Sequence, residues 1–167
     1  NSGVIDLDTL AVDGTIALAT HGTGSATVVN DAGLNFAAST VGGALSATAT
    51  TGDITDSGAL AITGTSTFRV AGGQSIILDS NGTFTDAVTF TSPGTILSVT
   101  INDSNAFELQ TLTITRDLTV TAGGNITDSG TVTVGRNLSA TTDANDGVIN
   151  LDTLAVDGTI ALVTHNN

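Results

Sequence analysis

The sequence lacks cysteine, tryptophan, tyrosine, methionine and lysine, and it contains a single proline among 167 residues. Without cysteine the chain forms no disulfide and no thiolate metal site. No run of about 18 apolar residues occurs, so no membrane-spanning helix is predicted. Without Trp or Tyr the chain lacks the aromatic platforms that commonly hold sugar rings in polysaccharide-processing enzymes. These absences leave little material for catalysis.

Positive charge is almost absent. Sixteen acidic residues face three arginines, so the formal net charge is −13, and only 11% of residues are charged. Nucleic acids and anionic membrane surfaces attract basic proteins, so both are excluded as partners. The chain is rich instead in threonine and glycine, and 40% of its residues are hydrophobic. This composition favours a folded all-β protein with many turns, because threonine packs well on exposed strands.

A long repeat is the strongest feature of the sequence. GVIDLDTLAVDGTIALATH (3–21) returns as GVINLDTLAVDGTIALVTH (147–165), with 17 of 19 positions identical at an offset of 144 residues. Half of that offset also occurs, since it separates GDITDSGALAITG (52–64) from the similar GNITDSGTVTVG (124–135). We therefore predict one repetitive segment over residues 1–167, with the second copy beginning at residue 145 and the window belonging to a longer array.

Turn-like sequences divide the long repeat further. VVNDAG (28–33), ILDSNG (77–82), INDSN (101–105) and the two DSG motifs each end a short β-branched or apolar run. Cutting at these turns predicts six coils of about 24 residues in each 144-residue repeat, with three short strands per coil. A single coil cannot bury its apolar face, so the coils are expected to stack as a parallel β-helix, or β-solenoid. Six coils at the strand spacing give a repeat of about 29 Å.

Alternation within the short strands predicts which side chains face the interior. Period-2 patterns place one set of apolar residues inward, and the five phenylalanines are expected to fill wider parts of the lumen. The predicted inward scaffold residues are Leu10, Val12, Ile16 and Leu18, with their copies Leu154, Val156, Ile160 and Leu162. Four turn glycines, Gly14, Gly58, Gly130 and Gly158, are expected to permit the corners. A tandem immunoglobulin-like array is the competing fold, and the short period disfavours it.

Residues for chemistry are few. The two histidines, His21 and His165, occupy the same repeat position, which is expected of scaffold residues rather than of a catalytic site. Calcium is the one cofactor considered: its oxygen ligands could come from Asp6, Asp8 and Asp13, or from Asn150, Asp152 and Asp157. The more economical interpretation makes these acids solvated surface and turn residues, and the calcium β-roll nonapeptide is absent. We therefore predict no catalytic, cofactor-binding or metal-binding residues and no enzymatic activity.

Three stretches carry a resemblance to a known family. GDITDSGALAITGTSTF, TLTITRDLTVTAGGNITDSGTVTVGRNLSATT and TLAVDGTIALVT resemble the giant β-strand-repeat surface proteins of bacteria, which are similar to filamentous-haemagglutinin-like adhesins. The resemblance implies a secreted or cell-surface, right-handed parallel β-helix that acts as a stalk, fibre or sheath. The expected partner is the protein itself, by end-to-end stacking or in a longer covalent array. The alternative is an adhesin segment that binds a glycan or a surface through its outer face.

Overall fold

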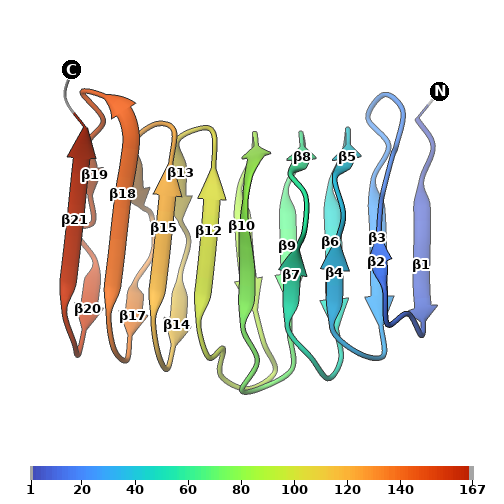
Figure 1. Cartoon of the computed structure of the whole chain (residues 1–167), viewed down its shortest axis with the longest axis horizontal. Helices are drawn as coiled ribbons and strands as arrows, with labels where there is room; N and C mark the ends of the chain where they lie inside the picture. Colours follow the sequence, from blue (N-terminus) through green and yellow to red (C-terminus); the bar gives the residue numbers. More distant parts are fainter. Residues whose placement is uncertain (1, 166–167) are drawn as a thin grey trace.

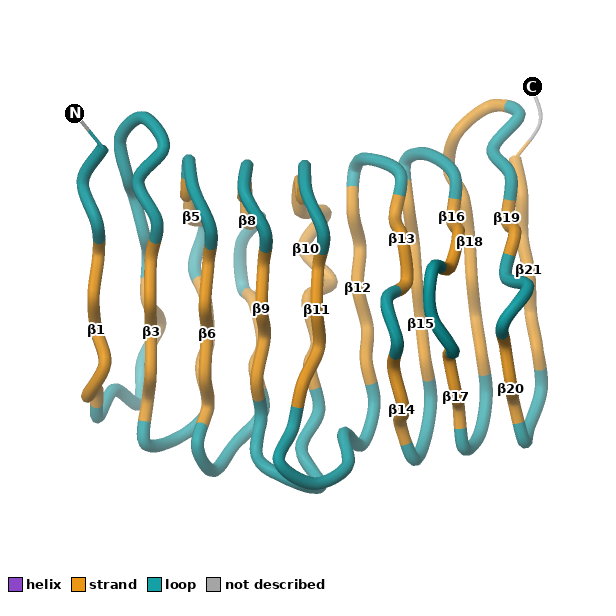
Figure 2. The backbone as a smooth tube through the Cα atoms, turned by 180° about the vertical axis from the view of Figure 1, so that it is seen from behind, coloured by secondary structure: helices purple, strands orange, loops and turns teal. Residues whose placement is uncertain are grey.

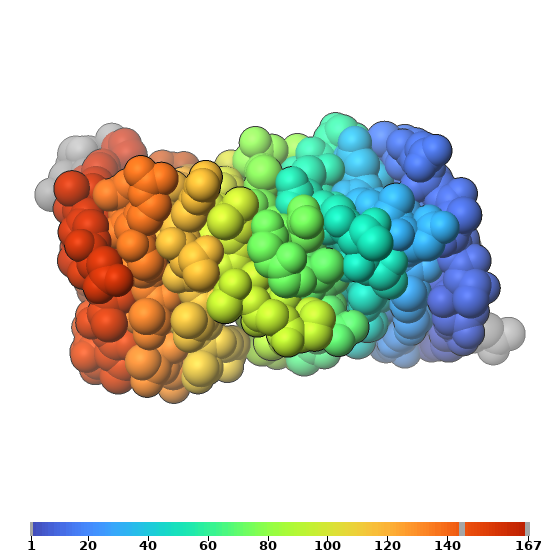
Figure 3. All heavy atoms as spheres, turned by 90° about the horizontal axis from the view of Figure 1, so that it is seen from below, coloured from blue at the N-terminus to red at the C-terminus, as the bar shows by residue number. Residues whose placement is uncertain are grey.

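The computed structural model describes residues 2–165, apart from the side chains of residues 144 and 145, and its regular elements are all β-strands (Figures 1 and 2). No helix that could span a bilayer occurs among these residues. The strands lie roughly perpendicular to the long axis of the molecule. Figure 3 shows the coils in sequence order along that axis, from the blue N-terminal end to the red C-terminal end. The predicted all-β solenoid is confirmed.

One sheet runs along nearly the whole molecule, and we call it the continuous sheet. Its order is β2-β4-β7-β10-β12-β15-β18-β21, and β8 and β5 branch from β10. Its strands are β2 (Thr15–Ile16), β4 (Leu34–Phe36), β7 (Ile54–Asp56), β10 (Ile76–Phe84), β12 (Val99–Asp103), β15 (Leu118–Ala122), β18 (Leu138–Asn145) and β21 (Ile160–His165). The branch consists of β5 (Ser39–Val41) and β8 (Leu60–Ile62).

The opposite side of the solenoid is built from separate sheets (Figure 2). In the N-terminal half it is the sheet β1 (Ile5–Leu10), β3 (Ala26–Asn30), β6 (Leu45–Ala49), β9 (Ser66–Arg69) and β11 (Val88–Thr91). In the C-terminal half two short-stranded sheets replace it. They are β13 (Phe107–Leu109), β16 (Ile126–Asp128) and β19 (Ile149–Asn150), and β14 (Leu112–Ile114), β17 (Val132–Val134) and β20 (Leu154–Val156).

The strand pairs set the coil length. Every pair is parallel, as a solenoid requires, and paired residues lie 19 to 23 positions apart: Ala26 pairs with Leu45, and Ile76 with Val99. The chain makes about eight turns with a spacing of roughly 21 residues. About seven coils therefore fill one long repeat, and the prediction of six longer coils was wrong. The turn motifs used for that count lie at different corners, since Asp56 is the last residue of β7 in the continuous sheet whereas Asp128 is the last residue of β16 on the opposite side.

The long strand of each coil moves to the other side of the solenoid half-way along its length. Around residues 45–62 each coil has one five-residue strand, β6, followed by two three-residue strands, β7 and β8. Around residues 118–134 the same long–short–short pattern recurs as β15, β16 and β17, but the long strand now belongs to the continuous sheet. Half of the long repeat spans about three and a half coils, so the two similar sequences that it separates lie on opposite sides. Only the full repeat is close to a whole number of coils.

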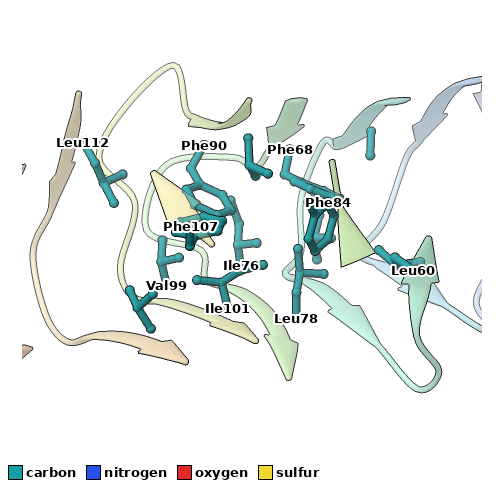
Figure 4. Packing of buried hydrophobic residues seen from close by; sticks show 14 of the residues in the cluster. Leu60, Phe68, Ile76, Leu78, Phe84, Phe90, Val99, Ile101, Phe107 and Leu112 are labelled. Carbon is teal, nitrogen blue, oxygen red and sulfur yellow. The ribbon is translucent and has the colours of Figure 1, made fainter. Parts of the chain in front are cut away.

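The lumen is filled by stacked apolar side chains. Leu112 and Ile114, which alternate with threonines in the stretch TLTIT (111–115), are buried at 4% and 2% exposure, and all five phenylalanines are buried as predicted. Phe68 meets Phe84 edge-on, with ring centroids 6.1 Å apart, and stacks on Phe90 at 6.2 Å. Four of the five phenylalanines gather in this middle region (Figure 4). The aromatic cluster therefore lies where the long strand of each coil moves to the other side of the solenoid.

The eight scaffold residues differ in burial according to their coil. Leu18 is buried, Val12 is half-buried, and Leu10, Ile16, Leu154 and Val156 are partly buried, packing against the core. Ile160 and Leu162 are in register with Leu138 and Ala140 of the coil below, yet they are 52% and 53% exposed because β21 is the last strand of its sheet.

Close approach between coils explains three of the four turn glycines. A Cβ at Gly58 would lie 2.5 Å from the Ala38 nitrogen, one at Gly130 would lie 2.6 Å from the Thr111 nitrogen, and one at Gly158 would overlap the Arg136 carbonyl. Gly14, the copy of Gly158, meets nothing within 4 Å, because no coil lies beneath it. Positive φ is therefore not the reason for these glycines: among the described glycines only two others, Gly22 and Gly73, have it.

Candidate functional site

A cleft opens where the long strand of each coil moves to the other side of the solenoid, and we call it the seam cleft. The N-terminal sheet ends at β11, and the next strand on that side, β13, is not paired with it. The resulting cavity has a volume of about 380 Å³. Its lining combines apolar residues from the lumen with carboxylates and amides at the rim: Phe84, Thr85, Asp86, Ala87, Val88, Asp103, Ala106, Phe107, Glu108 and Gln110.

Asp103 lies at the end of β12 and is the most unusual residue in the seam cleft. It follows Val99 and Ile101 in the inward phase of the strand, so its carboxylate is carried inside the solenoid, with 1% exposure. Its Oδ1 accepts hydrogen bonds from the backbone N–H groups of Phe84 and Asn105, each at 3.1 Å. Its Oδ2 has no hydrogen-bond partner among the described residues. Burial raises the pKa of Asp103, and the two N–H donors oppose that rise.

Two exposed acids stand at the rim of the cleft. Asp86 accepts a hydrogen bond from the Ala87 N–H at 2.8 Å, and Glu108 accepts one from the Gln110 side-chain amide at 2.8 Å. The lining offers carboxylates, an amide and apolar surface but no histidine, lysine or arginine. Such a cleft can bind hydroxyl or cationic groups of a ligand through its carboxylates.

The histidines lie far from the cleft and from each other. His21 is exposed in the first coil, and His165 lies in the last strand. The His165 Nδ1 lies 2.9 Å from the Thr142 carbonyl oxygen and 3.7 Å from Asp143 Oδ1, with both side chains more than half exposed. The structure does not bring the two histidines together.

The acids considered for calcium are all exposed on the outer surface. Asp6, Asp8 and Asp13 belong to the first coil, and Asn150, Asp152 and Asp157 occupy the equivalent places in the last. Within residues 2–165 no group of three or more His, Cys, Asp or Glu side chains is arranged to hold a metal ion.

The acid below the last coil, Asp128, is a turn former instead. Burial raises the pKa of Asp128, but hydrogen bonds from Thr153 and from the Asp152 N–H outweigh it and hold that pKa below its usual value.

Buried polar residues at the corners were not predicted. Asn30 is fully buried, and its side-chain amide accepts from the Val12 N–H at 2.9 Å while donating to the carbonyls of Val12 and Gly33, at 2.9 and 2.6 Å. Asp103 plays a related part at another corner. Both had been interpreted as ordinary turn residues. The alternation of inward and outward residues could have found them, because each occupies the third inward position of its strand.

The fold defines the chain as a β-solenoid repeat protein. A family model described as repeats of unknown function (DUF5649) matches residues 23–91 and 97–167, and the chain therefore belongs to this family. The two matched segments begin at positions 23 and 97, so their separation is close to half of the long repeat found in the sequence. No curated protein and no solved structure matches the chain. The finer resemblance to filamentous-haemagglutinin-like adhesins stays a prediction.

Proposed function

We propose that this protein is a structural, non-catalytic element of an extracellular or cell-surface fibre, stalk or sheath of bacteria, built by coil-on-coil stacking. The observation that carries the proposal is the continuous sheet, which passes unbroken from β2 to β21 through the place where the other sheets change. Such a sheet transmits tension along the axis through many parallel backbone hydrogen bonds. The solenoid in this role grows by adding coils rather than by docking separate domains.

The surface charge suits a fibre. The carboxylates considered above, Asp103 excepted, lie on the outside, and the net charge is −13. Fibres that carry the same charge repel one another laterally, which keeps them separate and soluble.

Electron microscopy of the native material tests the proposal. Filaments should show an axial spacing of about 4.8 Å from the strands and a long repeat of about 34 Å, which is seven coils at that spacing. This value replaces the shorter repeat predicted from the sequence, which assumed six coils. Isolated short particles with no axial repeat would count against the fibre.

The second candidate is an adhesin segment, and the seam cleft is the observation that favours it. The cleft interrupts an otherwise regular outer face and combines Asp86, Asp103 and Glu108 with apolar walls. Glycan-array binding to the full chain, lost on replacing Asp86 and Glu108 by alanine, would support this function. The matched control replaces two outer acids away from the cleft, Asp6 and Asp79, in the same way.

A further inference from the structure

The seam cleft contains a buried carboxylate whose hydrogen bonding is incomplete. Asp103 is 1% exposed and lines the cleft, and its Oδ1 accepts hydrogen bonds from two backbone N–H groups. Its Oδ2 has no hydrogen-bond partner among the described residues. A buried carboxylate oxygen without a donor is costly, because water no longer solvates it. Asp103 Oδ2 therefore needs a donor that the described part of the chain does not provide.

The side chains beside Asp103 do not supply that donor. Its partners in the strand register, Gly82 and Ala122, carry no polar side chain. The Ser104 hydroxyl shares a 2.7 Å hydrogen bond with a threonine hydroxyl, and the Asn105 side-chain amide donates to a backbone carbonyl at 3.4 Å. The missing donor is therefore expected to come from a molecule that occupies the cleft.

The size and the walls of the cleft suit a small organic molecule. Its volume of about 380 Å³ falls within the range of about 300–1,000 Å³ that is typical of ligand pockets. Its apolar walls are Phe84, Val88 and Phe107, all of them buried in the lumen, and Figure 4 shows the two phenylalanines among the packed side chains. Because packing holds these side chains in place, the walls are formed before a ligand arrives.

The charge of the lining favours a cation over a neutral ligand. The carboxylates of Asp86, Asp103 and Glu108 line the cleft, and none of the chain's three arginines does. The two backbone donors on Asp103 Oδ1 favour its charged form. A neutral hydroxyl would complete the hydrogen bonding of that carboxylate but leave its charge unpaired, whereas an ammonium group would do both.

A metal ion suits the cleft less well than an organic cation. A hard cation such as Ca²⁺ needs several oxygen ligands that converge on one point. Within residues 2–165 no group of three or more acidic or histidine side chains is arranged in that way. The apolar walls would also have no part in holding a metal ion.

We infer that the seam cleft binds a small organic ammonium ion, whose N–H groups donate to Asp103 Oδ2 and whose apolar body lies between the apolar walls. The exposed carboxylates of Asp86 and Glu108 attract the cation at the rim. The inference goes beyond the fibre function and does not rest on it, since the cleft lies within a single chain. It differs from the glycan-binding candidate in the charge of the ligand.

Isothermal titration calorimetry of the full chain with 2-phenylethylammonium chloride tests the inference. This probe should bind saturably at one site. The alcohol 2-phenylethanol keeps the apolar body and should bind about tenfold more weakly, because charge-assisted hydrogen bonds are about twice as strong as neutral ones. The N-trimethylated cation keeps the charge but has no N–H donor, and it should also bind about tenfold more weakly.

A matched pair of variants assigns the binding to Asp103. Asp103→Asn keeps an acceptor for the two backbone N–H groups but replaces Oδ2 by an NH₂ group, so it should lose about tenfold or more in affinity for 2-phenylethylammonium. The control is Asp56→Asn, which removes the same charge outside the cleft. Asp56 accepts from the Asp79 and Ser80 N–H groups, at 3.1 and 3.3 Å. This variant should bind like the wild type, and the melting temperatures of both variants show that they are folded.

A second pair tests the cleft without touching Asp103. Ala87 is exposed at the rim, so Ala87→Phe should obstruct the cleft and weaken binding, whereas Ala59→Phe, at an exposed alanine outside it, should not. In NMR spectra of the wild type the probe should shift the amide signals of Phe84 and Asn105, which donate to Asp103 Oδ1.

Three results would overturn the inference. They are no saturable binding at millimolar concentrations of 2-phenylethylammonium, equal binding of the ammonium ion and the alcohol, and unchanged binding by both Asp103→Asn and Ala87→Phe. Equal binding of the alcohol would leave the glycan-binding candidate in place. None of these results bears on the fibre function, which the axial repeat of native filaments tests separately.

Discussion

Replacing Phe68 by alanine should be among the most destabilising single changes in this chain. Phe68 is fully buried in β9, pairs with Ala47 and Phe90, and its ring contacts both Phe84 and Phe90. Truncating a buried phenylalanine costs about 3–5 kcal/mol through lost transfer energy and the cavity left behind.

The change in melting temperature follows from the chain length. An unfolding entropy of about 2.1 cal/mol/K per residue gives about 0.35 kcal/mol/K for this chain, so a loss of about 4 kcal/mol lowers the melting temperature by about 11 °C. Circular dichroism of the β signal during heating measures it. The matched control is Thr67→Ala, on the outward face of the same strand, which should change stability by less than about 0.5 kcal/mol. Equal melting temperatures for the two variants would refute the assignment of Phe68 to a packed lumen.

Three further outcomes are expected. Burial raises the folded-state pKa of Asp103 above its unfolded value, so the wild-type protein loses stability as pH rises through the folded pKa. Asp103→Asn should remove this pH dependence. Urea unfolding at about pH 4 and about pH 7 should therefore show a larger increase in the free energy of unfolding over wild type at the higher pH. Gly158→Ala should cost about 1–3 kcal/mol because the new methyl group meets the Arg136 carbonyl, whereas Gly14→Ala should change little, and comparable melting temperatures would contradict this account. Ile16→Asp should loosen the first coil from the second, seen as faster amide exchange at Ala37, and unchanged protection would show that Ile16 does not face the lumen.

Local patterns in the sequence predicted the strands well. Ile5 and Leu7 are partly buried while Asp6 and Asp8 are exposed, and Leu112 and Ile114 are buried on either side of an exposed threonine. Alternation of this kind depends only on the pleat of one strand, so a short stretch suffices to show it. The long repeat likewise predicted that the first and last coils would be equivalent.

The number of coils could not be obtained in this way. The DSG and related motifs look equivalent in sequence, but Asp56 and Asp128 end strands on opposite sides of the solenoid. Where a coil closes depends on contacts between residues one coil apart and on the volumes that fill the lumen between them. A turn motif says that the chain bends, but it does not say which corner of the cross-section it forms.

The candidate site was missed for the same reason. The seam cleft exists because the long strand of each coil moves from one side to the other near β10 and β11, around a cluster of phenylalanines contributed by several coils. Alternation places Asp103 on the inward side of its strand, but the sequence does not show which coils enclose it. Its burial is a property of the coils stacked around it.

Sequence patterns alone thus predict the all-β class, the inward and outward faces of several strands, and the repeat that makes the first and last coils alike. These features arise from neighbouring residues or from identity at a fixed offset. The length of a coil, the change of side at the seam, the burial of Asp103 and Asn30, and the reason for the glycines emerge from the folded structure. Each of those depends on which residues lie one coil above and below, and that neighbour is set by packing across the lumen.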